Sequence, residues 1–122
     1  MPATDILTPA DVVTLVDQFY ARVNEDALLG PIFNEVARID WEHHLPRMYA
    51  FWQSLIFATA SYKGNPFAKH IPLPIDAAHF ERWLALFSAT VDDHFAGPVA
   101  EQTKQRARSI GHIFQTKLAY LR

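Results

Sequence analysis

The chain has 122 residues, a length typical of one domain, and a formal net charge of −2, a balance that argues against nucleic-acid binding. Half of the residues are hydrophobic and none is cysteine, so disulfides, thiolate nucleophiles, zinc–thiolate sites and iron–sulfur clusters are excluded. No apolar run is long enough to span a membrane and no signal-peptide pattern is present, so we expect a cytoplasmic protein whose residues 1–122 form a single domain.

The first predicted helix runs from about residue 9 to about residue 24. Thr8 is suited to cap it, and Pro9 fits the first helical position. Apolar side chains then recur at helical spacing: Val12, Val13, Leu15, Val16, Phe19, Tyr20 and Val23. Tyr20 therefore lies on the face that we expect to be buried.

A short segment and a second long helix follow. Gly30-Pro31 predicts a turn, and Phe33 comes after it in a short helical turn. The second helix is predicted from about residue 41 to about residue 60, with Asp40 as its cap. Its apolar or chemically distinctive positions form one stripe: His44, Met48, Phe51 and Leu55.

Residues 61–74 interrupt the helical pattern. Several residues there break regular structure, namely Gly64, Pro66, Pro72 and Pro74. Apolar side chains occur between them, and His70 is the one imidazole of the segment. A long loop with these features more often holds something than merely connects two helices. We therefore expect the rest of the chain to form a helical cage around whatever His70 ligates.

Two more helices complete the chain. One is predicted from about residue 76 to about residue 95, with Asp76 as its cap, and the other from about residue 98 to about residue 121. Gly97-Pro98 separates them. Their apolar faces are, in order, Phe80, Trp83, Leu84, Phe87 and Val91, and then Val99, Thr103, Ala107, Ile110, Phe114, Leu118 and Leu121. No strand is predicted, so the fold class is all-α.

Polar rings occur on the core-facing sides of three different helices, at Tyr20, His44 and Trp83. Together with His70 they would surround an interior that is otherwise apolar. A single histidine is a weak zinc site, but it suits haem, because the porphyrin supplies the other four nitrogen ligands. A flat apolar cofactor would also explain the high aromatic content of nine Phe, three Trp and four Tyr.

Each of these residues also has a simpler interpretation when it is considered alone. His70 would be a surface residue, Tyr20 a core tyrosine, Trp83 a packing residue and His44 an exposed first-turn residue. The remaining histidines, His43, His79, His94 and His112, are expected to have no functional role.

The ordered set of motifs resembles the truncated haemoglobins, and specifically their third group. The matching pieces are Phe19-Tyr20, Leu29–Phe33, Trp41–Met48, Phe51-Trp52, Tyr62-Lys63-Gly64 ending at His70, and His79–Phe87. They follow the order and spacing of that family from about residue 6 to about residue 120. The paired-glycine motifs of the other groups are missing, which also characterises the third group.

The resemblance implies a two-over-two helical sandwich around a non-covalent haem b. His70 would be the proximal iron ligand, and Tyr20, His44 and Trp83 would act on the ligand from the opposite side. Further residues would contact the cofactor: Phe33 at its edge, Arg47 as a propionate partner, Trp52 near its buried end, and Met48 and Tyr62.

A protein of this kind is expected to bind dioxygen, nitric oxide and carbon monoxide. Hydrogen bonds from Tyr20 and Trp83 would hold dioxygen too tightly for bulk transport, with His44 as a donor or a gate. We therefore expect nitric oxide oxidation or peroxide activation, with a reductase as electron donor. Two alternatives remain open, a haem-based ligand sensor and a haem-free helical interaction protein. The lack of a fused output domain weighs against the first, and the full set of polar rings weighs against the second.

Overall fold

The computed structural model describes residues 3–59, 62 and 64–122. Its helices are, in order, α1 (Pro9–Glu25), α2 (Leu29–Pro31), the π-helix η1 (Ile32–Val36), α3 (Trp41–Phe57), the 3₁₀ turn η2 (Ala68–His70), α4 (Ala77–His94) and α5 (Pro98–Leu121). The predicted all-α class is confirmed, since β-structure in this part of the chain is limited to one isolated bridge between Thr4 and Phe95. No helix there is long and apolar enough to cross a bilayer.

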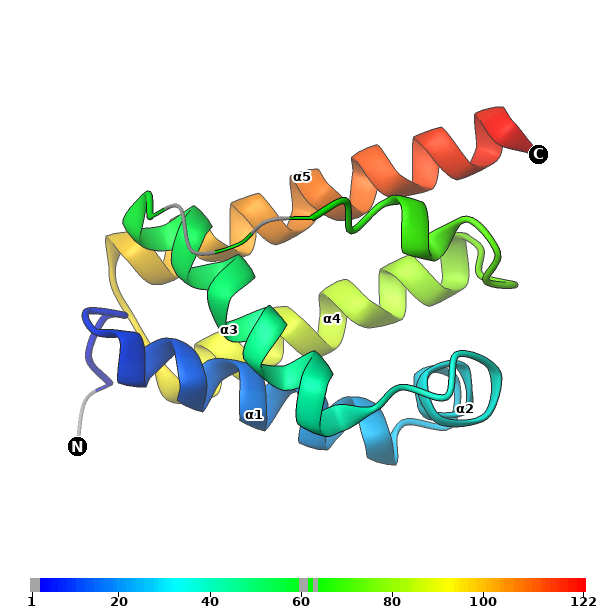
Figure 1. Cartoon of the computed structure of the whole chain (residues 1–122). Coiled ribbons are helices and arrows are strands. Elements are labelled where there is room, and N and C mark those ends of the chain that lie inside the picture. The colour runs from blue at the N-terminus through cyan, green and yellow to red at the C-terminus, as the bar shows by residue number, and fades with distance from the viewer. Residues whose placement is uncertain (1–2, 60–61, 63) are drawn as a thin grey trace.

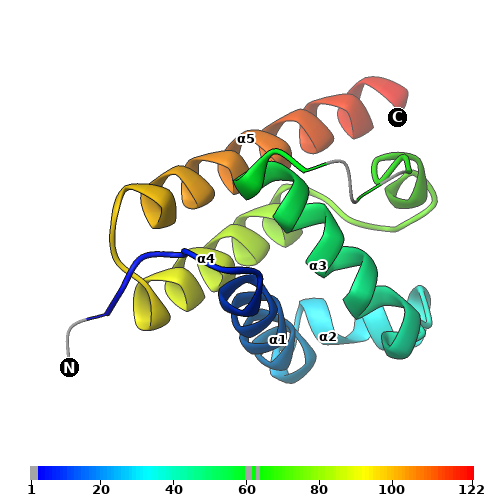
Figure 2. The ribbon, with the colours of Figure 1, turned by 60° about the vertical axis from the view of Figure 1, so that its left-hand side comes forward.

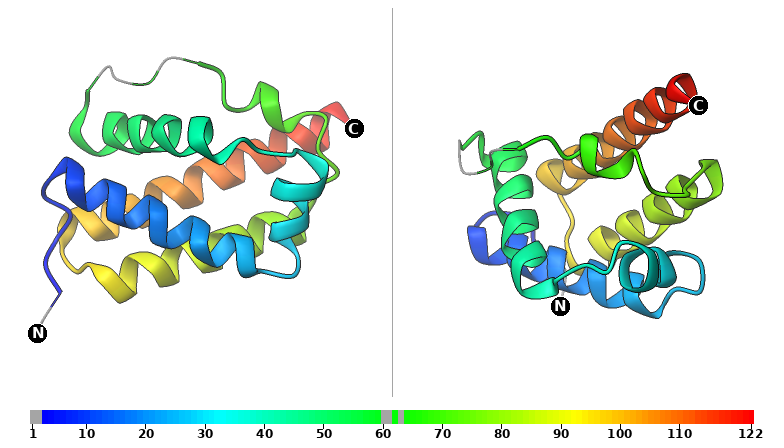
Figure 3. Two further views of the ribbon diagram at one scale, coloured as in Figure 1. Left: turned by 60° about the horizontal axis from the view of Figure 1, so that its bottom comes forward. Right: turned by 45° about the vertical axis from the view of Figure 1, so that its right-hand side comes forward.

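The long helices form two layers. α1 contacts both α3 and α4, and α4 contacts α5 along its length. Figure 2 shows α3 crossing α1 in one layer, while α4 and α5 run side by side in the other. The segment that contains η2 lies beside α5 and leads into the start of α4 (Figures 1 and 3). This arrangement places η2 opposite the inner faces of α1 and α3.

Aromatic rings connect the two layers at the centre of the molecule. Phe19 of α1 is 1% exposed, and its ring centroid lies 5.2 Å from that of Phe87 in α4. Trp52 of α3 stacks on the same Phe87 ring at 4.7 Å. Because large rings bury much area each, these contacts hold α1, α3 and α4 at fixed positions.

Three of the long helices start at their predicted caps, and α5 starts after Gly97 as predicted. Thr8 and Asp11 form a reciprocal capping box at α1, while Asp40 accepts from the N–H of Glu42 at α3. Asp76 caps α4 in the same way. The C-terminal ends agree within one residue, except that α3 ends at Phe57 rather than near residue 60. Ala58 adopts a left-handed conformation with φ of 54° and thereby stops the helix.

The structure differs from the sequence expectations at Gly30-Pro31 and at Leu121. The turn predicted at Gly30-Pro31 is wrong, because the carboxylate of Asp26 accepts hydrogen bonds from the N–H groups of Leu28 and Leu29 and starts α2 there. Gly30 and Pro31 then continue into η1, where Phe33 is helical as predicted. Leu121 was expected on the buried face of α5 but is 56% exposed. The expectations for Ala60, Ser61 and Lys63 lie outside the described residues.

The N-terminal segment holds the start of α5. The carboxylate of Asp5 accepts hydrogen bonds from the N–H groups of Val99 (2.9 Å) and Ala100 (2.8 Å). Gly97, the residue before α5, has no side chain to do this. A Cβ at Gly97 would lie 2.5 Å from Cγ of Asp5, so the glycine makes room for the distant cap. Asp5 therefore replaces a local N-cap residue across the fold.

We predict that Asp5→Ala lowers the free energy of unfolding by about 0.5–2 kcal/mol at neutral pH, as loss of a helix cap does. Desolvation opposes ionisation of this group, but three backbone N–H groups, those of Ile6 and of the first turn of α5, lower the pKa of Asp5. A carboxyl with a lowered pKa stabilises the fold above its unfolded pKa, and this stabilisation is lost as pH falls through the folded value. In urea titrations, the difference in free energy of unfolding between the wild type and Asp5→Ala should therefore be smaller in acid than at neutral pH.

The matched control is Glu81→Ala, which removes an exposed carboxylate from α4. We expect it to change the free energy of unfolding by no more than about 0.5 kcal/mol. Equal losses in the two variants would contradict the capping role of Asp5.

Candidate functional site

A cavity of about 390 Å³ lies between the two layers, and the η2 segment closes one side of it. Its volume is within the range of small-molecule and cofactor sites. All the predicted site residues line it: Tyr20, Phe33, His44, Arg47, Met48, Trp52, Tyr62, His70 and Trp83. The structure therefore brings together side chains that are separated by up to 63 positions in the sequence, from Tyr20 to Trp83.

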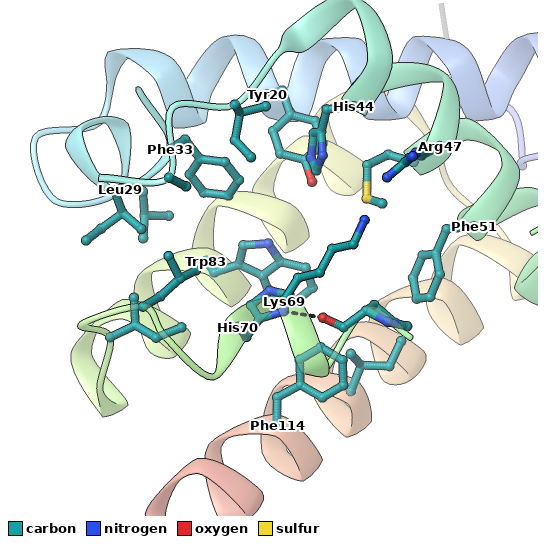
Figure 4. Close-up of a pocket in the computed structure, with 18 of the residues that line it drawn as sticks. Tyr20, Leu29, Phe33, His44, Arg47, Phe51, Lys69, His70, Trp83 and Phe114 are labelled. Carbon is teal, nitrogen blue, oxygen red and sulfur yellow. Dashed lines mark hydrogen bonds between the residues drawn. The ribbon is translucent and has the colours of Figure 1, made fainter. Parts of the chain in front are cut away.

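His70 occupies the wall formed by η2. Its Nδ1 lies 2.6 Å from the carbonyl oxygen of Pro66, the contact drawn as a dashed line in Figure 4. A carbonyl only accepts, so Nδ1 carries the proton and Nε2 keeps its lone pair. Burial lowers the pKa of His70, although the hydrogen bond to Pro66 acts in the opposite direction. The ring is therefore a neutral imidazole with one free nitrogen, the form that binds a metal ion.

Contacts from both sides hold the segment around His70. The side-chain oxygen of Asn65 accepts from the N–H of Ala68 (3.2 Å) before η2. After it, the guanidinium of Arg122 donates to the carbonyl oxygens of Ile71 (3.3 Å) and Ile75 (2.7 Å). The ring of Phe114 in α5 lies 5.1 Å from that of His70. The imidazole thus has a fixed position although it is carried by a loop.

Tyr20 of α1 and His44 of α3 face His70 from the opposite wall (Figure 4). Their ring centroids are 5.3 Å apart, with planes inclined at 78°. Neither the Tyr20 hydroxyl nor Nε2 of His44 has a hydrogen-bond partner among the described residues, and Nε2 is fully buried. Burial raises the pKa of the Tyr20 hydroxyl above its usual value, so it remains a donor.

The charge state of His44 follows from the same surroundings. Burial is the main cause that lowers the pKa of His44 to about 4, and the charges of Lys69 and Arg47 add to it. His44 is therefore neutral at physiological pH. An unpaired polar atom in a buried position is costly, so its presence here indicates a site that is built for a ligand rather than for stability.

Trp83 and Phe33 form the edge of the cavity between the two walls. Trp83 of α4 stacks on Phe87 with ring centroids 5.5 Å apart and planes at 14°. No described residue accepts a hydrogen bond from its indole N–H. Phe33 of η1 packs against Tyr20 at 5.7 Å. The stacking fixes the indole plane, so its donor also has a defined direction.

The closed end of the cavity is aromatic. Trp52 is 2% exposed there, and the ring of Phe51 lies 5.3 Å from those of both Trp52 and Tyr62. The backbone N–H of Tyr62 donates to the hydroxyl of Ser54 (3.0 Å), which attaches the loop to α3. This end offers apolar surface and no charge.

Two cationic side chains lie at the open side. Arg47 extends from α3, and Lys69 precedes His70 in η2. Figure 4 shows Lys69 reaching across the cavity toward the wall that carries Arg47. Both are exposed, and neither forms an ion pair within the described part of the chain. The site therefore combines an apolar interior with two free positive charges at its mouth.

Several lining residues were not predicted from the sequence as site residues. They are Leu29, Ile32, Phe51, Lys69, Ile110, Phe114 and, among the histidines expected to have no role, His43 and His79. Lys69 could have been predicted from its position next to His70. The apolar lining residues cannot be distinguished from core residues by periodicity. His43 is exposed and held by Asp40 at 2.7 Å, and Nδ1 of His79 belongs to the cap of α4.

The donor set fits a metal bound in a flat macrocycle better than a bare ion. Within the described residues, no group of three or more His, Asp or Glu side chains is placed to hold a metal ion. One free imidazole nitrogen suffices when a macrocycle supplies the other ligands. The opposite wall presents Nε2 of His44 without a partner among the described residues.

Comparisons with known proteins agree with this geometry. A sequence model of the family described as bacterial-like globin matches residues 6–118. A group 3 truncated haemoglobin of Campylobacter jejuni subsp. jejuni is 30% identical over 118 residues, covering 93% of this chain and 93% of that protein. The crystal structure of a group III truncated haemoglobin from Campylobacter jejuni matches with a TM-score of 0.86 and 30% identity, over 96% of this chain and 95% of that one. These matches confirm the resemblance found in the motifs.

We predict that His44 makes the haem-free protein sensitive to acid. Its pKa is about 4 in the folded chain, against about 6.5 for an unperturbed histidine. As pH falls from 7 to 4 the unfolded state binds this proton first, so the stability that is present above pH 6.5 is progressively lost. The variant His44→Gln should therefore lose less free energy of unfolding over this range, measured by urea titration at several pH values.

His112→Gln is the control, because it replaces an exposed imidazole that does not line the cavity. We expect this variant to keep the pH slope of the wild type. A His44→Gln slope identical to that of the wild type would show that His44 is not buried in its neutral form.

Proposed function

The chain belongs to the bacterial-like globins, as a group III truncated haemoglobin, and from this premise we propose that His70 ligates the iron of a non-covalent haem b. Globins bind haem and, through it, diatomic ligands, and this general function holds for the chain. When bound, haem would supply an iron atom that can hold a diatomic ligand. The side chains of this protein would hold the haem and form hydrogen bonds to its ligand.

The orientation of the His70 ring is the observation that supports this proposal most. The hydrogen bond from Nδ1 to the Pro66 carbonyl (2.6 Å) keeps Nε2 unprotonated and holds the imidazole in one tautomer. Such a bond also increases the basicity of the free nitrogen toward a metal. The contacts of Asn65 and Arg122 on either side of η2 keep the His70 ring facing the cavity.

The cations at the mouth support the binding of a haem, and the lack of cysteine favours the b type. The b-type macrocycle carries two carboxylates, and Arg47 and Lys69 reach the mouth from opposite walls without partners of their own in the described chain. Charge-assisted hydrogen bonds of this kind are stronger than neutral ones. The absence of cysteine agrees with attachment by these contacts and by His70, without a thioether bond.

On the ligand side, Tyr20 and Trp83 have the roles of hydrogen-bond donors. Their O–H and N–H groups come from different helices and have no competing acceptor among the described residues. A hydrogen bond to a ligand atom with negative charge contributes about 1.5–3 kcal/mol, and about 1.4 kcal/mol is a factor of ten in affinity. Two such bonds would slow the release of dioxygen far below what a carrier needs.

We therefore favour chemistry on the ligand over bulk oxygen transport. Oxidation of nitric oxide by dioxygen, or activation of peroxide, would benefit from donors that are fixed in place before the reaction. His44, which is neutral at physiological pH, is placed to donate or accept a proton beside Tyr20, or to gate access. Turnover of this kind needs an electron donor, so a reductase is the expected protein partner.

We predict that the purified wild type takes up hemin and shows the intense violet absorption band of a histidine-ligated haem, which shifts when carbon monoxide is added after reduction. His70→Ala should lose this spectrum or release hemin much faster to an acceptor protein, because the metal then has no axial ligand. His43→Ala, which changes an exposed imidazole, should behave like the wild type. A wild type that takes up no hemin, or a His70→Ala spectrum equal to that of the wild type, would falsify the assignment.

We further predict that Tyr20→Phe releases dioxygen at least about ten times faster than the wild type, which corresponds to about 1.4 kcal/mol. The phenyl ring keeps the packing and removes only the donor. Tyr49→Phe is the matched control, because its hydroxyl bonds Asp17 outside the cavity. Stopped-flow measurement of dioxygen dissociation tests the hydrogen bond, and mixing of the oxygenated protein with nitric oxide tests the reaction. Equal dissociation rates in all three proteins would show that the Tyr20 hydroxyl does not bond the ligand.

A further inference from the structure

Trp41, the first residue of α3, lies behind the ligand side of the cavity. It does not line the cavity itself, but its ring packs on three side chains that do. The centroid distances are 5.2 Å to Tyr20, 5.5 Å to His44 and 5.8 Å to Phe33. It meets Tyr20 and His44 edge to face and stacks on Phe33. Trp41 therefore supports both polar residues of this wall from outside.

Asn34 holds Trp41 in place. Its side-chain oxygen accepts from the indole N–H of Trp41 (2.9 Å), and its amide nitrogen donates to the side-chain oxygen of Asn24 (2.8 Å) and to the carbonyl of Gly30 (3.0 Å). This pattern allows only one orientation of the amide, because the oxygen must face an N–H and the nitrogen must face two oxygens. One side chain thus connects α1, the π-helix η1 and α3.

The polar wall needs such support. Nε2 of His44 has no hydrogen-bond partner among the described residues, so packing alone sets the orientation of this ring. The rings that pack on it are those of Tyr20, Phe33 and Trp41. Of these, Trp41 is tethered by the Asn34 amide. Short π-helical segments such as η1 occur frequently at functional sites, where they displace a side chain from regular spacing.

We propose that Asn34 and Trp41 are positioning residues for the ligand side: Asn34 fixes the indole of Trp41, and that ring holds Tyr20 and His44 at the distances from the ligand that their hydrogen bonds require. This inference rests on the proposed function, because the positioned groups act on a ligand of haem. Loss of the tether leaves the rings present but frees them to rotate. Neither residue lines the cavity.

Tyr49 provides a matched comparison within the same helix. Its hydroxyl donates to Asp17 of α1, so it also ties α3 to α1 by a single side-chain hydrogen bond. Tyr49 does not line the cavity. A general effect of loosening α3 should therefore be equal in Tyr49→Phe and Trp41→Phe, whereas an effect through the polar wall should occur only in the second.

The first experiment measures the C–O stretching frequency of carbon monoxide added to the reduced, haem-loaded protein, a frequency that falls when hydrogen-bond donors point at the ligand. We expect Asn34→Leu and Trp41→Phe to raise and broaden this band, and Tyr49→Phe to leave it unchanged. Dioxygen should dissociate about tenfold faster from the first two variants, which equals about 1.4 kcal/mol. Bands unchanged in both variants, or an equal shift in Tyr49→Phe, would overturn the proposal.

The second experiment uses the haem-free protein and follows the indole N–H signals of its three tryptophans by NMR. In the wild type the Trp41 proton should exchange slowly with solvent, and in Asn34→Leu it should shift and exchange at least several-fold faster, with the other two signals unchanged. An unaltered Trp41 signal would overturn the tether. This result does not depend on cofactor uptake, so a wild type that binds no hemin but shows the protected signal would refute the proposed function and the positioning role while leaving the tether established.

Discussion

The contact of Phe19 with Phe87 is the constraint on which the rest of the structure depends. Phe19 belongs to α1, and Phe87 belongs to α4, so this contact joins the two layers. Trp52 and Trp83 both stack on the ring of Phe87. Because these rings are too large to move without loss of packing, the layers cannot close further. The cavity begins where this aromatic cluster ends.

The polar groups around the cavity represent a loss of stability that the core must offset. Nε2 of His44 is buried without a hydrogen-bond partner among the described residues, whereas side chains cap the starts of α1, α3 and α4. Natural proteins violate the rule of satisfied buried polar atoms mainly at functional sites. The contrast between these capped helices and the unpaired His44 nitrogen therefore indicates where the protein acts.

Hydrogen bonds beside the cavity decide how its lining residues point. The Pro66 carbonyl selects the tautomer of His70, and the tether from Asn34 to Trp41 lies behind Tyr20 and holds an indole against it. Asn34 and Trp41 do not line the cavity, whereas Pro66 does. Such outer contacts matter because a misplaced donor loses most of its effect on a reacting ligand.

The amino-acid sequence by itself determined the helices, because caps such as Thr8 and Asp76 and the apolar spacing act within a few residues of the chain. Its ordered motifs also indicated the family and a part of the residues that line the cavity, among them Tyr20, His44 and His70. Only the tertiary structure decided that Gly30 continues a helix, that Lys69 reaches the mouth and that Trp41 supports the ligand side. The start of α2 depends on the Asp26 side chain and the position of Trp41 on Asn34, and the spacing of apolar residues carries no information about either hydrogen bond.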